Sequence, residues 1–202
     1  MSDAQIRDEA LTIFLAGHET TANAMSWTWH ALGGAPDVEA RLHAELDTVL
    51  NGRTPTVEDV PKLEWTRAVI AESMRLWPPA WTMGRRAFEP HTIDGHVIEK
   101  RALVLMSQYV VHRDPRWWPE PDAFKPERWL QPAGDRPKYA YFPFGGGTRL
   151  CIGESFAWTE AILLLATIAQ QWRFTPAGDP PVPEPRITLR PKGLSMVAQR
   201  RG

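Results

Sequence analysis

The chain has 202 residues, with 23 Lys or Arg against 24 Asp or Glu, so its formal net charge is −1. This balance argues against a surface that holds nucleic acid or anionic lipid by charge. Hydrophobic residues make up 43% of the chain, which is typical of a globular protein and excludes a disordered or collagen-like one. A single cysteine excludes an intrachain disulfide and a Cys-only zinc site.

The first third of the chain has the spacing of helices. Ser2 and Gln5 fit a capping box, and apolar residues keep helical spacing until Gly33, which predicts a helix of about 30 residues. A second helix is predicted over residues 36–50 and a third over 62–76, because prolines and glycines bound both segments. The longest apolar run is much shorter than the ~20 residues that span a bilayer.

Short strands and loops are expected from residue 81 onward. Asp94 and Gly95 predict a hairpin over residues 91–98, and residues 102–106 read as a buried strand. The segment 113–139 is rich in Pro, Trp and Asp without periodicity, so we expect an ordered meander held by aromatic packing.

The last part of the chain is expected to contain one helix and two strands. Residues 152–172 are apolar nearly all round and predict a buried helix. Residues 186–200 predict two strands that turn at Lys192 and Gly193. The fold class is therefore mainly α with small β-sheets (α+β).

Residues 142–153 are the segment most suggestive of chemistry, since glycines surround a basic residue and Cys151. Alternation predicts that Arg149 and Cys151 point the same way, while the glycines let the backbone approach something flat and bulky. A position at the start of the next helix favours a thiolate, as metal ligand or nucleophile. A buried structural cysteine is the alternative. A phosphate loop is excluded, because Leu150 follows Arg149.

Two other segments have two interpretations each. Gly17 and Thr20 have low helix propensity, yet they lie in the middle of the first predicted helix. This indicates that a backbone carbonyl or a hydroxyl group there is used for something other than the helix. The alternative is a tolerated glycine, with threonines that bond their own i−4 carbonyls. Glu72 and Arg75 share a helix face. As an exposed pair they would contribute little, whereas as a buried pair each charge would need the other.

These motifs resemble a known family, the haem-thiolate monooxygenases or cytochromes P450. FGGGTRLCIG at 144–153 resembles the family's cysteine-ligand loop, and AGHETT at 16–21 resembles its oxygen-activating segment. Glu72 and Arg75 resemble its Glu-x-x-Arg helix, and Arg128 resembles the third member of the same buried ion network. The resemblance implies the C-terminal half of the P450 fold. It divides the chain into helices at 1–76, hairpin and meander at 77–141, and ligand loop, buried helix and C-terminal hairpin at 142–202.

The resemblance also implies roles for individual residues. Cys151 would be the proximal ligand of the iron in haem b, iron protoporphyrin IX, and Thr20 and Glu19 would deliver protons on the distal side. The residues implied to hold the haem are Ala16, Gly17, Arg85, Phe144, Gly145, Gly147, Arg149, Cys151 and Gly153.

Other aromatic and polar residues are expected to be structural. The residues in this group are Glu72, Arg75 and Arg128 as an ion network, Trp117, Trp118 and Trp129 as packing for the meander, and His91, His96 and His112 as loop residues with local hydrogen bonds.

The implied activity is the insertion of one oxygen atom from dioxygen into a small apolar organic substrate. A ferredoxin or flavoprotein reductase would supply electrons, because the sequence has neither a flavin nor a nicotinamide fingerprint. We expect a cytoplasmic, bacterial-like protein, with an anchor in a missing N-terminal half left open. The first alternative is a truncated, non-catalytic haem-binding or inactive fragment. The second is a family member that rearranges or dehydrates peroxides, which Glu19 and Thr20 argue against.

Overall fold

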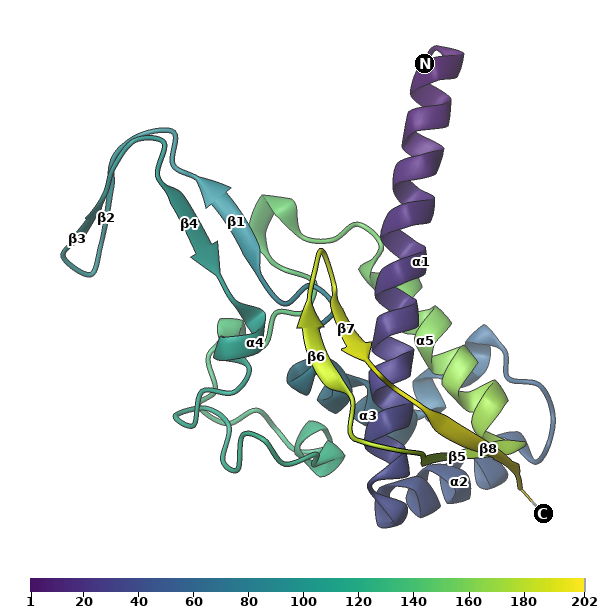
Figure 1. Ribbon diagram of the computed structural model, residues 1–202. Helices are drawn as coiled ribbons and strands as arrows, with labels where there is room; N and C mark the ends of the chain where they lie inside the picture. Colours follow the sequence, from purple (N-terminus) through teal and green to yellow (C-terminus); the bar gives the residue numbers. More distant parts are fainter. Residues whose placement is uncertain (202) are drawn as a thin grey trace.

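The structure is a computed structural model that describes residues 1–201. Helix α1 (Asp3–Gly33) is the longest element, and its N-terminal part stands out from the rest of the molecule (Figure 1). Three further helices gather around its C-terminal half: α2 (Pro36–Leu50), α3 (Glu64–Leu76) and α5 (Glu154–Ala169). The predicted long helix and its two successors are confirmed.

Local chemistry sets the ends of these helices. At the start of α1, the Ser2 N–H donates to Gln5 Oε1 at 2.8 Å, and the Gln5 N–H donates to Ser2 Oγ at 3.3 Å. Pro36 occupies the first turn of α2, and Asn51 ends that helix in the left-handed conformation. Helix α3 begins two residues later than predicted, because the 3-10 turn Val57–Lys62 precedes it.

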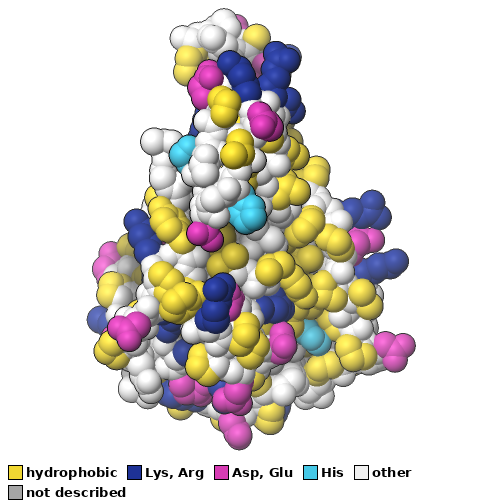
Figure 2. Space-filling view, turned by 90° about the vertical axis from the view of Figure 1, so that its left-hand side faces the viewer, with side chains coloured by type: hydrophobic (Ala, Val, Ile, Leu, Met, Phe, Trp, Pro, Cys, Tyr) yellow, Lys and Arg dark blue, Asp and Glu magenta, His cyan; other side chains and the backbone are white. Residues whose placement is uncertain are grey.

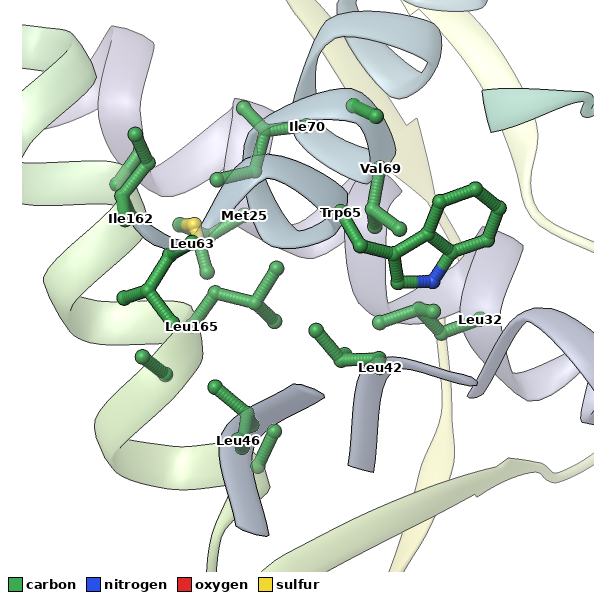
Figure 3. Close-up of a cluster of buried hydrophobic side chains, with 14 of the residues drawn as sticks. Met25, Leu32, Leu42, Leu46, Leu63, Trp65, Val69, Ile70, Ile162 and Leu165 are labelled. Carbon is green, nitrogen blue, oxygen red and sulfur yellow. The ribbon is translucent and has the colours of Figure 1, made fainter. Parts of the chain in front are cut away.

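The core lies where the four helices meet (Figure 3). Each helix contributes fully buried apolar side chains, and burial of one such Leu or Ile stabilises the fold by about 1.5–3 kcal/mol. The core residues shown as labelled sticks are Met25, Leu32, Leu42, Leu46, Leu63, Trp65, Val69, Ile70, Ile162 and Leu165.

Helix α5 is less buried than predicted. We expected burial all round over residues 152–172, yet the helix ends at Ala169 and buries one stripe. Phe156 and Leu164 on its other side are 67% and 40% exposed. The physical reason is that packing against α1, α2 and α3 covers one side of a helix only.

Two antiparallel ribbons extend to one side of the helices (Figure 1). Strand β1 (Met83–Arg86) pairs with β4 (Leu103–Met106), and β2 (His91–Ile93) pairs with β3 (His96–Ile98). Asp94 and Gly95 both have positive φ, 47° and 78°, as the tight turn between β2 and β3 requires. The predicted hairpin is confirmed.

The predicted burial of β4 is wrong. Leu103 and Leu105 are 62% and 65% exposed, while the alternate residues Val104 and Met106 are half-buried. A run of apolar residues predicts burial on both faces of a strand. Strand β4 instead belongs to a two-stranded ribbon, which leaves one of its faces uncovered.

Four strands near the C-terminus form two more antiparallel pairs. Strand β5 (Trp172–Pro176) pairs with β8 (Met196–Arg200), and β6 (Val182–Pro185) pairs with β7 (Leu189–Lys192). The two strands expected over residues 186–200 exist, but they do not form a hairpin with each other. Each pairs instead with an earlier strand, β7 with β6 and β8 with β5, so the β6–β7 pair lies inside the connection between β5 and β8.

The meander that follows α4 (Gln108–Val111) is ordered by aromatic packing, as predicted. The Trp118 ring is buried, and its Nε1 donates to the Ala140 carbonyl at 3.1 Å. The Trp129 ring lies 5.6 Å from that of Trp118 and 4.4 Å from that of Tyr141. Two 3-10 turns, Pro126–Trp129 and Lys138–Ala140, are the regular elements of this segment.

The surface mixes charged and apolar side chains. Figure 2 shows hydrophobic groups interspersed with charges of both signs on the face that carries the β ribbons. Large apolar side chains in the N-terminal part of α1 are exposed, among them Ile6, Leu11, Ile13, Phe14 and Leu15. No helix within residues 1–201 is long and apolar enough to span a membrane.

Candidate functional site

The cysteine loop, Phe144–Gly153, connects the meander to α5. The Cys151 N–H donates to the Phe144 carbonyl at 3.0 Å and so closes the loop. A 3-10 turn at Gly147–Arg149 interrupts the strict alternation that the sequence suggested. Cys151 itself is exposed, so the alternative of a buried structural cysteine is wrong.

Two glycines of the loop have a backbone that other residues rarely adopt. Gly145 and Gly147 have φ of 81° and 65°. A Cβ on Gly145 would also lie 3.3 Å from Met83 Cε, so the loop packs closely against β1. Gly153 is different, because a Cβ there would lie 3.8 Å from Cys151 Sγ, at an ordinary contact distance. Its neighbour Glu154 begins α5, slightly later than predicted.

Arg85 and Arg149, the two arginines that the resemblance implies hold the haem, are exposed. Arg85 is in β1, two residues beyond the Met83 contact with the loop, and its Nη1 donates to the Gly84 carbonyl at 2.9 Å. Arg149 lies in the 3-10 turn of the cysteine loop. In the described part of the chain, no carboxylate pairs with either guanidinium. Both positive charges therefore remain available to an anionic group.

Segment 16–21 lies within the continuous helix α1. Thr20 Oγ1 donates to the Ala16 carbonyl at 2.7 Å, the i−4 bond that the alternative interpretation expected. The helix continues through Gly17, where an added Cβ would meet nothing within 4 Å. Because the hydroxyl proton is used in this bond, the lone pairs of Thr20 Oγ1 are free to accept a hydrogen bond.

Glu19 has a partner that sequence analysis missed. Thr188 Oγ1 lies 2.6 Å from Glu19 Oε1, and Asn23 Nδ2 donates to the same Thr188 oxygen at 2.9 Å. Because the Asn23 amide is a donor, the single hydroxyl proton of Thr188 is directed to the Glu19 carboxylate. Thr188 lies 169 residues away from Glu19, so no local pattern could identify it.

A buried ion network supports the meander. Glu72 and Arg75 are fully buried, so the interpretation of a solvated surface pair is wrong. Arg75 Nε and Nη2 donate to the two Glu72 oxygens at 2.9 and 2.8 Å, and Arg128 Nε donates to Glu72 Oε1 at 3.0 Å. Trp129 Nε1 and the Lys125 N–H add two bonds to Glu72, each of 2.9 Å. Trp129 was expected only to pack, and its bond to Glu72 was missed.

The other side of Arg75 holds backbone carbonyls. Its Nη1 donates to the carbonyls of His112 and Pro121 at 2.9 and 2.6 Å, and its Nη2 donates to that of Ala123 at 3.0 Å. One buried guanidinium thus fixes the start and the middle of the meander relative to α3. Burial of the Arg75 charge is tolerated only while its hydrogen-bond partners remain.

The histidines differ from the sequence expectation, since His91 and His96 lie in strands rather than in loops and the His112 side chain bonds a distant residue. His91 and His96 lie exposed on the β2–β3 ribbon. His112 is fully buried, and its Nε2 accepts the Phe142 N–H at 2.9 Å across 30 residues of sequence. The expectation of a local hydrogen bond is therefore wrong for the His112 side chain. Burial, followed by the charge of Arg75, lowers the pKa of His112 to about 3.

The metal-binding side chains present fit a metal ion whose other ligands come from a cofactor. Within residues 1–201, no three His, Cys, Asp or Glu side chains gather as a metal site. One exposed sulfur can complete the coordination of iron already held by a porphyrin. Exposed apolar side chains include Ile152 in the loop itself, Leu105 in β4 and Phe14 in α1, two residues before segment 16–21. The residues present therefore fit a large apolar group with a metal centre.

The fold and the loop define a class of protein, the haem-thiolate type, in which one cysteine in a glycine-rich loop binds iron. A sequence model of the family described as cytochrome P450 matches residues 1–198. The chain belongs to the cytochrome P450 family, which confirms the resemblance and the expected fold class. Membership of this family implies haem as the cofactor.

Named relatives match nearly the whole chain. It is 47% identical over 199 residues to "Putative cytochrome P450 132" of Mycobacterium tuberculosis, covering 98% of this chain and 43% of the relative. It is 46% identical over 203 residues to cyclooctatin synthase of Streptomyces melanosporofaciens, covering 100% and 44%. It is 37% identical over 201 residues to pentalenene oxygenase of Streptomyces avermitilis, covering 98% and 42%. The chain thus spans less than half the length of these relatives.

Proposed function

We propose that the protein is a haem-thiolate monooxygenase, which inserts one oxygen atom from dioxygen into a small apolar organic substrate. The observation that carries this proposal is the exposed Cys151 sulfur in a closed, glycine-dependent loop. Membership of the cytochrome P450 family supports it, as does the similarity to relatives named as oxygenases. The similarity to bacterial relatives favours a cytoplasmic location.

On the proximal side, Cys151 Sγ would bind the iron of haem b. Phe144, whose ring lies 5.9 Å from that of Trp158, would shield the sulfur from water. The guanidinium groups of Arg149 and Arg85, which pair with no carboxylate in the described part of the chain, would bind the propionates by charge-assisted hydrogen bonds. The conformations of Gly145 and Gly147 would let the loop backbone approach the flat face of the cofactor, with Gly153 beside the sulfur. When bound, the haem supplies the iron centre at which dioxygen is activated.

On the distal side, Thr20 and Glu19 would hold and move protons. Thr20 Oγ1 keeps its lone pairs free, because its proton is donated to Ala16. Glu19 is the one carboxylate of segment 16–21 and is exposed, so it can exchange protons with water. Ala16 and Gly17, which carry no bulky side chain, would face the haem.

Electrons would come from another protein or domain, a ferredoxin or a flavoprotein reductase. The chain itself has neither a flavin nor a nicotinamide fingerprint. The apolar side chains exposed near the site, such as Phe14, favour an apolar substrate.

Substitution of Cys151 tests the proposal. Two chains are compared: residues 1–202 alone, and a chimera in which they replace the matched segment of cyclooctatin synthase. Each is loaded with haem, reduced and treated with carbon monoxide. We expect a long-wavelength Soret band from the chimera and its loss in Cys151→Ser, because an alcohol does not provide the thiolate donor. If the Cys151→Ser chimera showed the same long-wavelength band as the unsubstituted chimera, the proposal would be contradicted. Absence of haem from residues 1–202 alone favours the inactive fragment for that chain.

Substitution of Thr20 tests the distal assignment. In the chimera, Thr20→Ala should keep the Soret band but divert reducing equivalents from product to peroxide, because the hydroxyl that directs protons is lost. The measurement is the ratio of product to electrons consumed, with Thr20→Ser as the control that retains the hydroxyl. Unchanged coupling in Thr20→Ala would remove Thr20 from the mechanism. Oxygen consumption with substrate separates this function from peroxide rearrangement.

A further inference from the structure

His112 is the buried titratable group that the proposed mechanism does not use. It follows the short helix α4 directly, and its side chain is fully buried between aromatic rings. The ring centroids of Tyr141 and Phe142 lie 5.0 and 5.3 Å from that of His112. Its position therefore joins the start of the meander to the residues that precede the cysteine loop.

The hydrogen bonds of His112 define its chemical form. Nε2 accepts the Phe142 N–H at 2.9 Å, so this nitrogen carries no proton. Burial and the neighbouring Arg75 charge keep the ring neutral, with a pKa lowered to about 3. A neutral imidazole has one proton, which must then reside on Nδ1.

The backbone of His112 is fixed independently of its side chain. Its N–H donates to the Gln108 carbonyl at 2.8 Å, and its carbonyl accepts Arg75 Nη1 at 2.9 Å. Arg75 is in turn held by the two oxygens of Glu72. The imidazole thus extends from a backbone that the buried ion pair anchors.

The bond to Phe142 acts at the entrance of the cysteine loop. The Phe142 carbonyl accepts the Gly145 N–H at 2.9 Å, which forms the first turn of the loop. The Phe144 carbonyl, within that turn, accepts the Cys151 N–H at 3.0 Å. Two backbone hydrogen bonds therefore link the residue that His112 contacts to Cys151.

We propose that His112 is a positioning residue, which transmits the fixed position of the Glu72–Arg75 pair to the Phe142 backbone and so sets where the Cys151 loop begins. The proposal rests on the proposed function for its chemical consequence, since only a metal-binding Cys151 gives the loop position a catalytic meaning. In this role the imidazole must accept the Phe142 N–H at Nε2, so an apolar side chain of similar volume cannot replace it.

The first test reads the tautomer in the unmodified chain. Nitrogen-15 NMR of residues 1–202 should show His112 with a proton on Nδ1 and a bare Nε2. Free histidines and most solvent-exposed ones can adopt either form, so the spectrum distinguishes an acceptor at Nε2 from a packed ring. A protonated Nε2 at His112 would overturn the proposal.

The second test removes the acceptor. His112→Leu keeps an apolar volume without a nitrogen, and His112→Gln offers an oxygen at a similar reach. Hydrogen exchange at the Phe142 amide should be about tenfold faster or more in His112→Leu and close to the original rate in His112→Gln. Gln108→Leu is the matched control, since Gln108 is fully buried in α4, the helix that His112 follows, and its side chain has no hydrogen-bond partner within residues 1–201. Equal Phe142 exchange in His112→Leu and Gln108→Leu would overturn the proposal.

A third measurement links the bond to the metal site and separates the two proposals. In the haem-loaded chimera, His112→Leu should convert part of the long-wavelength carbon monoxide band to a shorter-wavelength form, while His112→Gln and Gln108→Leu retain it. A full band in His112→Leu would overturn the positioning role.

The two proposals can fail separately. If Cys151→Ser also retains the band, the proposed function fails, yet the tautomer and the Phe142 exchange still report on the His112 bond. If His112→Leu fails to fold, the tautomer and the His112→Gln result decide.

Discussion

At the scale of single residues, Glu72 shows how a buried charge is kept. Its two oxygens accept five hydrogen bonds, from two nitrogens of Arg75 and one each of Arg128, Trp129 and Lys125. Removing a carboxylate from water costs several kcal/mol, which these bonds and the two positive charges offset. The neutral isostere would leave two guanidinium groups without their counter-charge.

We therefore expect Glu72→Gln to destabilise the chain by about 3–5 kcal/mol, the cost of breaking a buried pair. Urea unfolding followed by circular dichroism measures this difference. The control is Glu89→Gln, because Glu89 forms an exposed pair with Lys100 and should lose less than about 1 kcal/mol. Equal losses for the two variants would show that the Glu72 network contributes no more than a surface pair.

At the scale of elements, α1 contains two glycines in opposite environments. A Cβ on Gly33 would lie 2.8 Å from the Phe174 carbonyl oxygen of β5 and 3.0 Å from Met196 Cε of β8. A Cβ on Gly17 would meet nothing within 4 Å. The end of α1 therefore packs its backbone directly on the β5–β8 pair, while its middle is open.

Propensity alone predicts that either Gly→Ala change stabilises α1 by up to ~1 kcal/mol. We expect Gly17→Ala to follow this rule. Gly33→Ala should instead destabilise the chain by about 1–3 kcal/mol, because the backbone of β5 cannot move aside without loss of its pairing. Thermal and urea unfolding of the two variants provide the measurement. A stabilised Gly33→Ala would show that β5 and β8 do not rest on α1.

At the scale of the whole molecule, burial makes three histidines hard to protonate. It lowers the pKa of His112 to about 3 and, with the nearby Arg201 charge, that of His43 to about 4. It also lowers the pKa of His30. Unfolded histidines titrate near 6.5, so unfolding takes up protons when the pH lies between the folded value and about 6.5. The stability due to the neutral rings is complete above that range and is lost as the pH falls.

We expect the free energy of unfolding to decrease as the pH falls from about 7 to about 5, before most carboxyl groups titrate. The fully buried His112 contributes a slope approaching about 1.4 kcal/mol per pH unit, and the half-buried His43 and His30 contribute less. Urea unfolding at several pH values gives the profile. His112→Gln should have a shallower slope, whereas a profile that is flat between these limits would contradict the burial of the three rings.

How much the sequence determined follows from how far apart the interacting residues lie. The helix starts at Ser2 and Pro36, the turn at Asp94 and Gly95 and the composition of the cysteine loop are local, because caps, turns and strained glycines involve residues a few positions apart. Of these features, the cysteine loop also carried the family resemblance. The sequence placed Glu72 and Arg75 on one helix face for the same reason.

Only the tertiary structure decided which of these groups are buried and what they meet. The burial of the Glu72–Arg75 pair, the exposure of β4 and the pairing of β7 with β6 depend on elements that pack from elsewhere in the chain. Glu19 and Thr188, or His112 and Phe142, share no sequence period, since long-range contacts arise from chain topology rather than from local conformational preference. The sequence thus predicted the chemistry that we propose for Cys151, and packing decided which residues support its loop.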